Sequence, residues 1–211
     1  MVEGTPEKKV LGQRERIRYN RQLKIPEFGE GAQKRLKSSH ALIAGIGGLG
    51  CASATYLTVA GVWRITIVDF DVVELSNLNR QVLYGDGDIG EKKVLVAQRK
   101  LSQLNPGVEI VPIFARITEQ NVFRIISGVQ VVLDGLDNFG TRLLVDSACV
   151  KHKIPFVHGG VSRFRGLVTT ILPGETPCLA CLYPEGSPGG EGLGCYHRLR
   201  MDPPPTEMGT H

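Results

Sequence analysis

A glycine turn between an apolar run and a stretch of small residues constrains the fold of this 211-residue chain more than any other feature. Residues 41–44 are all apolar, residues 45–50 read GIGGLG, and Asp69 closes a second apolar segment at 64–69. Short apolar runs of this kind are typical of strands that are buried on both faces of a parallel sheet. Glycines between such a strand and a helix, with an acidic residue about twenty positions later, predict a nucleotide-binding turn.

The residues of this turn have separate expected roles. Gly45 permits the tight change of direction, Gly47 lets a phosphate approach the backbone, and Gly50 lets the helix pack closely on the strand. The helix that follows would direct unpaired N–H groups at the anion, and Asp69 would accept hydrogen bonds from the ribose hydroxyls. The alternative is a tight turn without a ligand. The motif favours a nucleotide but does not say which one.

Alternating patterns along the rest of the chain extend this unit into a sheet. The expected strands lie at 41–44, 64–69, 108–114 and 129–133, a fifth begins at 155–158, and an antiparallel addition follows at 166–172. The expected helices lie at 14–23, 28–38, 51–60, 92–104, 119–126 and 138–152. Strands that alternate with helices form parallel sheets covered on both sides. We therefore expect an α/β, Rossmann-like fold: a mostly parallel sheet with helices on both faces and an added antiparallel strand.

Composition divides the chain into three parts. Residues 1–13 carry glycine, proline and charge without an apolar period, which predicts a disordered leader. Residues 14–175 hold the alternating pattern and are expected to form the nucleotide-binding domain. From residue 173 onward proline, glycine and charge dominate, so residues 176–211 are expected to form an irregular and loosely packed tail.

The overall composition argues against several classes of protein. A formal net charge of +4 is too small to argue for nucleic-acid binding. No apolar run reaches the roughly eighteen residues of a membrane span, and residues 1–21 lack the apolar core of a signal peptide. We therefore expect a cytoplasmic protein without membrane or nucleic-acid partners. In a reducing compartment the closely spaced Cys178 and Cys181 favour metal binding or redox chemistry over a disulfide.

Charged residues downstream of the glycine turn narrow the chemistry. Arg80 lies in the run NLNRQ, Lys93 begins an expected helix, and Asp137 lies in the run DGLDN after an expected strand. Two cations and a carboxylate at a strand end favour polyphosphate chemistry over hydride transfer. An NAD(P)-dependent oxidoreductase stays an alternative, although no acid–base pair of a second domain is visible. Taken singly, Arg80 and Lys93 have a simpler interpretation as solvated charges, and Asp137 with Asn138 as a helix N-cap.

Together these segments resemble the ubiquitin-activating-enzyme-like adenylyltransferases, the family that includes the bacterial MoeB, ThiF and HesA proteins. The resemblance runs from about residue 18 to about residue 181, most of the chain. The segments that carry it are RYNRQ at 18–22, GIGGLGC at 45–51, DFD at 69–71, LSNLNRQ at 75–81, GEKK at 90–93, DN at 137–138 and CLAC at 178–181.

The resemblance implies an ATP-dependent adenylyltransferase. Such enzymes activate the C-terminal carboxylate of a ubiquitin-fold sulfur-carrier protein that ends in Gly-Gly, here of the molybdopterin or thiamine type. The carboxylate attacks the α-phosphate of ATP and gives an acyl-adenylate and pyrophosphate. Since an anionic nucleophile must approach an anionic phosphate, neutralising charge is the main catalytic problem. Residues 14–175 would then form the ATP-binding adenylyltransferase domain.

The resemblance also assigns residues to roles. Arg80 and Lys93 would neutralise the phosphates, Asp137 would hold Mg²⁺, and Arg21 would reach in from the other subunit of a homodimer. The implied nucleotide contacts are Gly45, Gly47, Gly48, Gly50, Asp69, Asn77, Arg80 and Lys93. Asp71 and Glu74 have only a local interpretation, in which they cap or solvate the loop.

The cysteines leave two questions open. Cys178 and Cys181 have the spacing of half a tetrahedral zinc site, which a second Cys-x-x-Cys pair completes in the resembling family. In this sequence only Cys195 and His197 follow as candidate ligands, and their spacing differs from that of the family. A zinc ion bound by Cys178, Cys181, Cys195 and His197 and an incomplete half-site therefore remain alternatives. Cys195 is also a candidate nucleophile, with an inert thiol as the alternative.

The segment after residue 181 does not match the family pattern. A catalytically impaired nucleotide-binding or dimerisation module of the same fold is therefore the rival to an active adenylyltransferase.

The remaining cysteines and histidines are expected to be structural. Cys51 and Cys149 lie on apolar helix faces and should belong to the core. His40, His152 and His158 have no partner at the spacing of a nucleophile and base, and we assign them no role.

Overall fold

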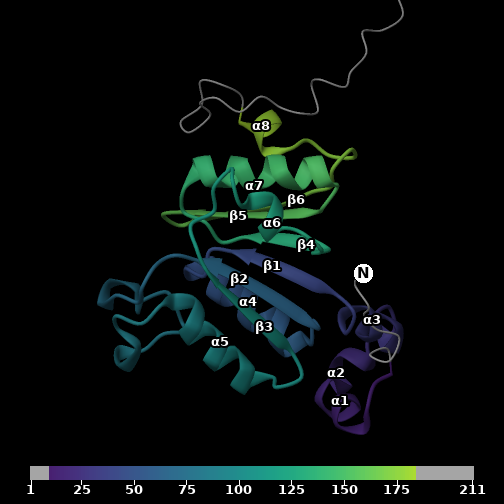
Figure 1. The fold of residues 1–211 in the computed structure, drawn as a ribbon. Helices are drawn as coiled ribbons and strands as arrows, with labels where there is room; N and C mark the ends of the chain where they lie inside the picture. Colours follow the sequence, from purple (N-terminus) through teal and green to yellow (C-terminus); the bar gives the residue numbers. More distant parts are fainter. Residues whose placement is uncertain (1–9, 184–211) are drawn as a thin grey trace, which may run out of the picture.

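The computed structural model describes residues 10–183 of the chain (Figure 1). Its centre is a six-stranded sheet with the order β3-β2-β1-β4-β5-β6. The strands are β1 (His40–Ala44), β2 (Arg64–Asp69), β3 (Glu109–Phe114), β4 (Val131–Asp134), β5 (Phe156–Ser162) and β6 (Arg165–Ile171). Neighbouring strands from β3 to β5 run parallel, and only the β5–β6 pair of this sheet is antiparallel. The expected fold class is confirmed.

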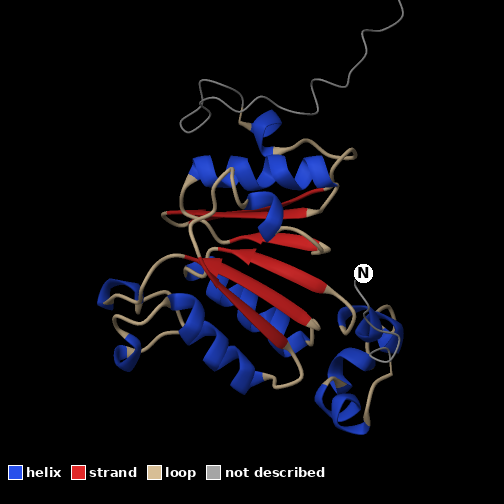
Figure 2. Cartoon of the chain, viewed as in Figure 1, coloured by secondary structure: helices blue, strands red, loops and turns tan. Residues whose placement is uncertain are grey.

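Helices flank the sheet on both sides (Figure 2). The α-helices are α1 (Gln13–Arg18), α2 (Asn20–Leu23), α3 (Gly29–Leu36), α4 (Gly48–Ala60), α5 (Lys93–Leu104), α6 (Val122–Ile125), α7 (Phe139–His152) and α8 (Leu179–Leu182). Two short 3₁₀ turns, η2 (Leu75–Asn77) and η3 (Asp86–Asp88), lie in the connection between β2 and α5. None of the described helices is long and apolar enough to cross a membrane.

Strand β1 shows how the sheet separates two apolar cores. Ala41 and Ile43 pack with residues of α4 and α5, whereas Leu42 and Ala44 pack with residues of α6, α7 and α8. All four side chains are buried. Because successive side chains of a strand point to opposite faces, both faces of β1 must be covered, and an uninterrupted apolar run is the result.

The expected helix at 14–23 is in fact two helices, and the prediction of one was wrong. The chain breaks at Tyr19, whose side chain is buried and accepts a hydrogen bond from Asn105 Nδ2 at 2.9 Å. The Tyr19 ring also lies against Gly61, where an added Cβ would come within 2.5 Å of the ring. Tertiary packing of one aromatic ring therefore overrides the local helical pattern.

The other differences concern the ends of elements. Helix α4 begins at Gly48 rather than at 51, so the glycine turn itself opens the helix. Helix α6 is shorter than expected, and β5, which was expected to begin at 155–158, continues through Gly159 and Gly160 to Ser162. Glycine is a poor strand former, but here β6 pairs with both glycines and extends β5.

Both ends of the described chain pack more closely than composition suggests. Leu11 is buried although the leader was expected to continue to residue 13. At the other end, residues 173–183 are not loose: Cys178 and Leu179 are buried, and the Leu179 N–H donates to Asp146 Oδ2 at 2.9 Å. This anchor attaches α8 to α7. The division into leader, domain and tail stays a prediction.

Candidate functional site

A cavity of about 320 Å³ opens at the carboxyl ends of the parallel strands. It lies where the strand order reverses, between β1 and β4, which is where open α/β sheets bind ligands. The expected site residues that line it are Gly45, Gly47, Gly48, Asp69, Arg80, Lys93 and Asp137. The fold thus collects residues from several separate segments around one space.

Three residues expected at the nucleotide site do not line this cavity. Gly50 lies beneath the turn, where an added Cβ would overlap the carbonyl oxygen of Gly45, so its role is packing. Asn77 is buried, and its Oδ1 accepts from the Glu74 N–H at 3.2 Å, which holds the η2 turn. Arg21 is exposed on α2, at the far side of the molecule.

The position of Arg21 follows from the contacts of its helix. Gln22, the next residue, donates to the carbonyl oxygen of Ala60 at 3.2 Å. Ala60 ends α4, whose other end opens at the glycine turn. At a rise of about 1.5 Å per residue this 13-residue helix is about 20 Å long. Arg21 and the phosphate-binding end of α4 therefore lie at opposite edges of the sheet.

The glycine turn brings backbone groups together that side chains would keep apart. Gly45 has a φ of +85°, and a Cβ there would approach the carbonyl oxygen of Gly135 to 2.7 Å. Gly47 is the N-cap of α4 and Gly48 its first residue. The amino end of this helix, with its unpaired N–H groups, therefore faces the cavity, as phosphate binding requires.

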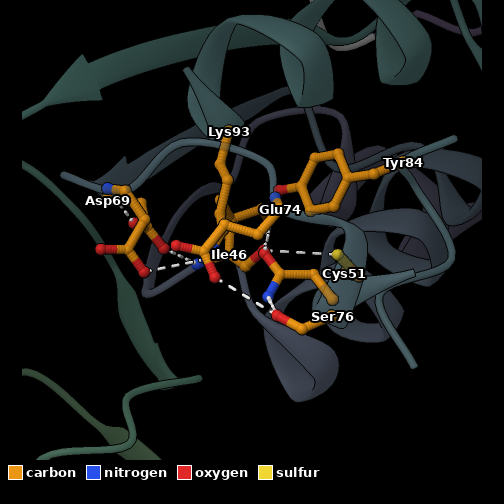
Figure 3. Close-up of polar contacts among 9 residues, drawn as sticks. Ile46, Cys51, Asp69, Glu74, Ser76, Tyr84 and Lys93 are labelled. Carbon is orange, nitrogen blue, oxygen red and sulfur yellow. Dashed lines mark hydrogen bonds and ion pairs between the residues drawn. The ribbon is translucent and has the colours of Figure 1, made fainter. Parts of the chain in front are cut away.

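Asp69 ties the turn to the end of β2. Its Oδ2 accepts from the Ile46 N–H and its Oδ1 from the Asp71 N–H, both at 2.8 Å (Figure 3). A carboxylate offers about four acceptor positions, so both oxygens can still accept from a ligand hydroxyl. The Ile46 carbonyl oxygen is held from behind by Tyr84 Oη at 2.8 Å and Cys51 Sγ at 3.3 Å. Burial raises the pKa of the Cys51 thiol to about 11, which is consistent with a core role.

Lys93 is buried and forms an ion pair with Asp71, which is about half exposed. The distance between Lys93 Nζ and Asp71 Oδ2 is 2.8 Å, and the Lys93 N–H donates to the Asp71 carbonyl oxygen at 3.0 Å. Sequence reasoning gave Asp71 only a capping or solvating role, and the spacing DFD after a strand was the signal that could have found it. Glu74 does have a local role, since it accepts from Ser76 Oγ at 3.2 Å (Figure 3).

Two arginines add positive charge to the cavity. Arg80 Nη1 donates to the Ser76 carbonyl oxygen at 2.9 Å and to Asn79 Oδ1 at 3.1 Å, which leaves other guanidinium N–H groups for a ligand. Arg116 follows β3 and stacks over the Phe70 ring, 3.7 Å from its centroid. Sequence reasoning missed Arg116 because no motif surrounds it.

Asp137 is exposed and makes no hydrogen bond or ion pair with residues 10–183. The simpler interpretation as an N-cap holds for its neighbour: Asn138 Oδ1 accepts from the Thr141 N–H at 2.9 Å. A carboxylate oxygen is a preferred ligand of Mg²⁺, which usually takes one or two carboxylates together with phosphate oxygens. The donor chemistry at Asp137 therefore fits a magnesium ion that arrives with a nucleotide.

A buried polar network lies next to Asp137, and sequence reasoning missed it. Asp134 Oδ2 contacts His158 Nδ1 at 2.6 Å and Arg142 Nε at 2.9 Å, and Asp134 Oδ1 accepts from the Leu136 N–H at 2.9 Å. The Arg142 Nε contact is an ion pair rather than an aligned hydrogen bond. Sequence reasoning assigned His158 no role because no partner stands at the spacing of a nucleophile and base; the fold instead joins it to a carboxylate 24 positions away in sequence.

Asp146, which lies on α7, is a second buried carboxylate beside this network. It is close enough to interact with both Asp134 and His158. Its Oδ2 accepts from Leu179, while its Oδ1 has no hydrogen-bond partner in the described part of the chain. Burial is the main cause that raises the pKa of this carboxyl, to about 6.

The described residues do not support a zinc site. Cys178 and Cys181 lie with their sulfur atoms 3.6 Å apart. Within residues 10–183, no group of three or more His, Cys, Asp or Glu side chains could hold a metal ion. Cys195 and His197, which would have to complete the set, lie outside the described residues.

Comparison with known proteins gives a consistent result. The sequence profile of the ThiF family matches residues 19–207. The chain is 44% identical over 168 residues to the vegetative HesA protein of Trichormus variabilis, a match that covers 80% of this chain and 63% of HesA. It is 43% identical over 183 residues to the sulfur carrier protein adenylyltransferase of Thermus thermophilus, covering 84% of this chain and 68% of that protein.

A solved structure extends the comparison to three dimensions. The E. coli tRNA N6-threonylcarbamoyladenosine dehydratase TcdA, in complex with ATP, superimposes with a TM-score of 0.67 at 27% identity. The match covers 73% of this chain and 65% of TcdA. The chain thus spans under two thirds of the length of both HesA and TcdA.

Proposed function

The chain belongs to the ThiF family, and from that membership we propose that it binds ATP in the cavity and adenylates the C-terminal carboxylate of a ubiquitin-fold sulfur-carrier protein. The carrier would be of the molybdopterin or thiamine type and end in Gly-Gly. One observation carries the proposal: the amino end of α4, the cations Arg80 and Lys93, and the carboxylate of Asp137 line a single cavity. The Thermus relative is named for this activity.

The residues of the cavity divide the work of such a reaction. A carrier carboxylate oxygen would form a bond to the α-phosphorus of ATP while the bond to the β-phosphate oxygen breaks and pyrophosphate leaves. Arg80 and Lys93 would neutralise the charge that develops, and the N–H groups at Gly47 and Gly48 would hold phosphate oxygens. Asp69 would hold the ribose. A magnesium ion that arrives with ATP would supply further charge neutralisation, with Asp137 as its protein ligand.

Arg21 would act in a different copy of the chain. It lies at the opposite edge of the sheet from the cavity, about 20 Å away along α4. It would therefore reach a phosphate only in the cavity of a second copy. The distance leaves Arg21 no role in the cavity of its own copy, and we therefore propose a homodimer in which each copy contributes Arg21 to the other.

ATP–pyrophosphate exchange tests the proposal. We expect exchange that requires MgCl₂ and a carrier ending in Gly-Gly, and no exchange with the same carrier after the two glycines are removed. Asp88→Asn should keep the exchange rate of the wild type, because Asp88 is paired with cations but lies outside the cavity. Background exchange with several such carriers, while ATP binds, would contradict the proposal.

The exchange assay and a titration with ATP and NADH separate the rivals. In an impaired module, exchange would appear only after the C-terminal region of a relative is joined at residue 182. In an NAD(P)-dependent oxidoreductase, NADH would bind more tightly than ATP, and Arg80→Ala would leave that binding unchanged.

A further inference from the structure

The segment that carries Asp137 is fixed on every side, while Asp137 itself is not. Leu136 precedes it, and both polar backbone groups of Leu136 are bound by side chains. The Leu136 N–H donates to Asp134 Oδ1 at 2.9 Å, and Arg142 Nη2 donates to the Leu136 carbonyl oxygen. Asn138 follows and caps α7. The Asp137 carboxylate is thus the one side chain of this short segment that is left for a ligand.

Asp134 and Arg142 contact each other, and Asp134 also contacts His158. Asp134 Oδ2 lies 2.9 Å from Arg142 Nε and 2.6 Å from His158 Nδ1. Since a carboxylate only accepts hydrogen bonds, Nδ1 of His158 carries the proton of this contact. His158 is 2% exposed and lies on β5, so its position is set by the sheet and not by the loop.

The segment also touches the phosphate turn directly. A Cβ on Gly135 would come within 2.5 Å of the Gly45 carbonyl oxygen, and the Gly135 N–H donates to the Ala44 carbonyl oxygen at 2.8 Å. Whatever fixes Gly135 and Leu136 therefore also fixes the backbone at Asp137 relative to the glycine turn.

We propose that the buried Asp134–His158–Arg142 network is the positioning device that presents the Asp137 carboxylate to magnesium-bound ATP. Asp134 and Arg142 hold Leu136 from its two sides, and His158 holds Asp134 against the sheet. The inference rests on the proposed function for the identity of the ligand. It adds positioning residues that act through Asp137 and do not touch the nucleotide.

The test measures ATP affinity by calorimetry in EDTA and again in MgCl₂, with the thermal midpoint as a check on folding. The ratio of the two affinities is the magnesium gain. Asp137→Asn should abolish this gain. His158→Leu and Asp134→Asn should reduce it at least fivefold, while the affinity in EDTA stays within twofold of the wild type. His158→Asn, whose amide can donate near the position of Nδ1, should restore the gain.

The matched control is Asp88→Asn. Asp88 also holds a backbone N–H, that of Gly85, and pairs with Arg99 and Lys100, but it lies outside the cavity. Its magnesium gain should equal that of the wild type. If Asp134→Asn does not fold, Arg142→Lys carries the same expectation, since it keeps the charge and loses the nitrogen that binds Leu136.

Several outcomes would overturn the inference. The first is a magnesium gain in His158→Leu or Arg142→Lys that equals that of the wild type. The second is a loss of ATP affinity in these variants that is equal with and without magnesium. The third is a wild type that shows no magnesium gain. Failure of the proposed function looks different: the wild type would show a magnesium gain but no pyrophosphate exchange with any carrier.

Discussion

The cavity has one wall after β2 and another after β4, and the two differ in where they keep their charges. The β2 wall (residues 69–93) keeps Arg80 exposed and pairs Lys93 with a half-exposed Asp71. The β4 wall (residues 134–146, with His158) buries Asp134 and His158 almost completely, and Asp137 is the one charged residue of 134–146 that is exposed. Exposed pairs can exchange partners cheaply, whereas buried pairs cannot. In the β2 wall, Arg80 and Asp71 are therefore accessible to solvent or a ligand, whereas the β4 wall holds most of its charges in a buried network.

The largest expected effect is on the stability of the β4 wall. Asp134→Ala leaves Arg142 and His158 without their shared partner in a buried site, so the free energy of unfolding should fall by about 3 to 5 kcal/mol. Urea denaturation measures this loss. Asp86→Ala, which removes an exposed carboxylate, is the control. Equal losses in the two variants would remove the contrast between the walls.

The second effect concerns catalysis at the β2 wall. Arg80→Ala removes an exposed cation, so stability should not change, but the exchange rate should fall by about 10²- to 10³-fold, or about 3 to 4 kcal/mol. Arg35→Ala, an exposed cation on α3, should leave the rate unchanged. If ATP affinity and rate fall equally, Arg80 contributes only to ground-state binding.

The third effect is a pH dependence of the β4 wall. Burial raises the pKa of Asp146 to about 6 from an ordinary value of 3.8, so the stabilising protonated form is lost as pH rises through this range. Asp146→Asn keeps the acceptor for Leu179 and cannot ionise. It should match the wild type at pH 4 and exceed its stability above pH 6 by on the order of 2 to 3 kcal/mol. Denaturation of both proteins from pH 4 to 8 measures the difference, and a constant difference would contradict this account.

A smaller effect is expected from the ion pair of the β2 wall. In Asp71→Asn the phosphates no longer compete with a carboxylate for Lys93, so ATP should bind up to about fivefold more tightly, or about 1 kcal/mol, the scale of a half-exposed pair. Calorimetry with Asp86→Asn as control measures this. Weaker binding would show that Asp71 holds Lys93 in place for ATP instead of competing with it.

The smallest effect lies outside both walls. Glu30 pairs with Arg16 and Lys34 on the surface, and hydrogen bonds from these side chains, Arg16 first, lower its pKa to about 2. Because these pairs are exposed and screened by salt, Glu30→Gln should leave the thermal midpoint unchanged in physiological salt. If Glu30→Gln lowered the free energy of unfolding as much as Asp134→Ala does, burial would not be what makes an ion pair matter for stability.

Sequence reasoning predicted the β2 wall better than the β4 wall, for a physical reason. The glycine turn, Asp69, Arg80 and Lys93 belong to local patterns, and local patterns are visible in sequence. The pair of Asp134 and His158 exists only because β4 and β5 lie side by side in the sheet. No spacing rule marks such a pair.

The same reason explains which parts of the fold were predicted. Apolar runs and helical periods located the strands of the sheet and most helices. The break at Tyr19 depends on a contact with Gly61, which is distant in sequence, and the end of β5 depends on pairing with β6. Composition alone also could not show that Leu179 would be anchored by a buried carboxylate.

The contact between Gly45, Gly50 and Gly135 has a consequence for how this chain can evolve. A Cβ on Gly50 or Gly135 would collide with the Gly45 carbonyl oxygen, and a Cβ on Gly45 would collide with that of Gly135. The obstacle in each case is a backbone atom, which every amino acid carries. A change at one of these glycines therefore has no compensating side-chain change elsewhere. We therefore expect substitutions to be tolerated at the residues beside these three glycines and not at the glycines themselves.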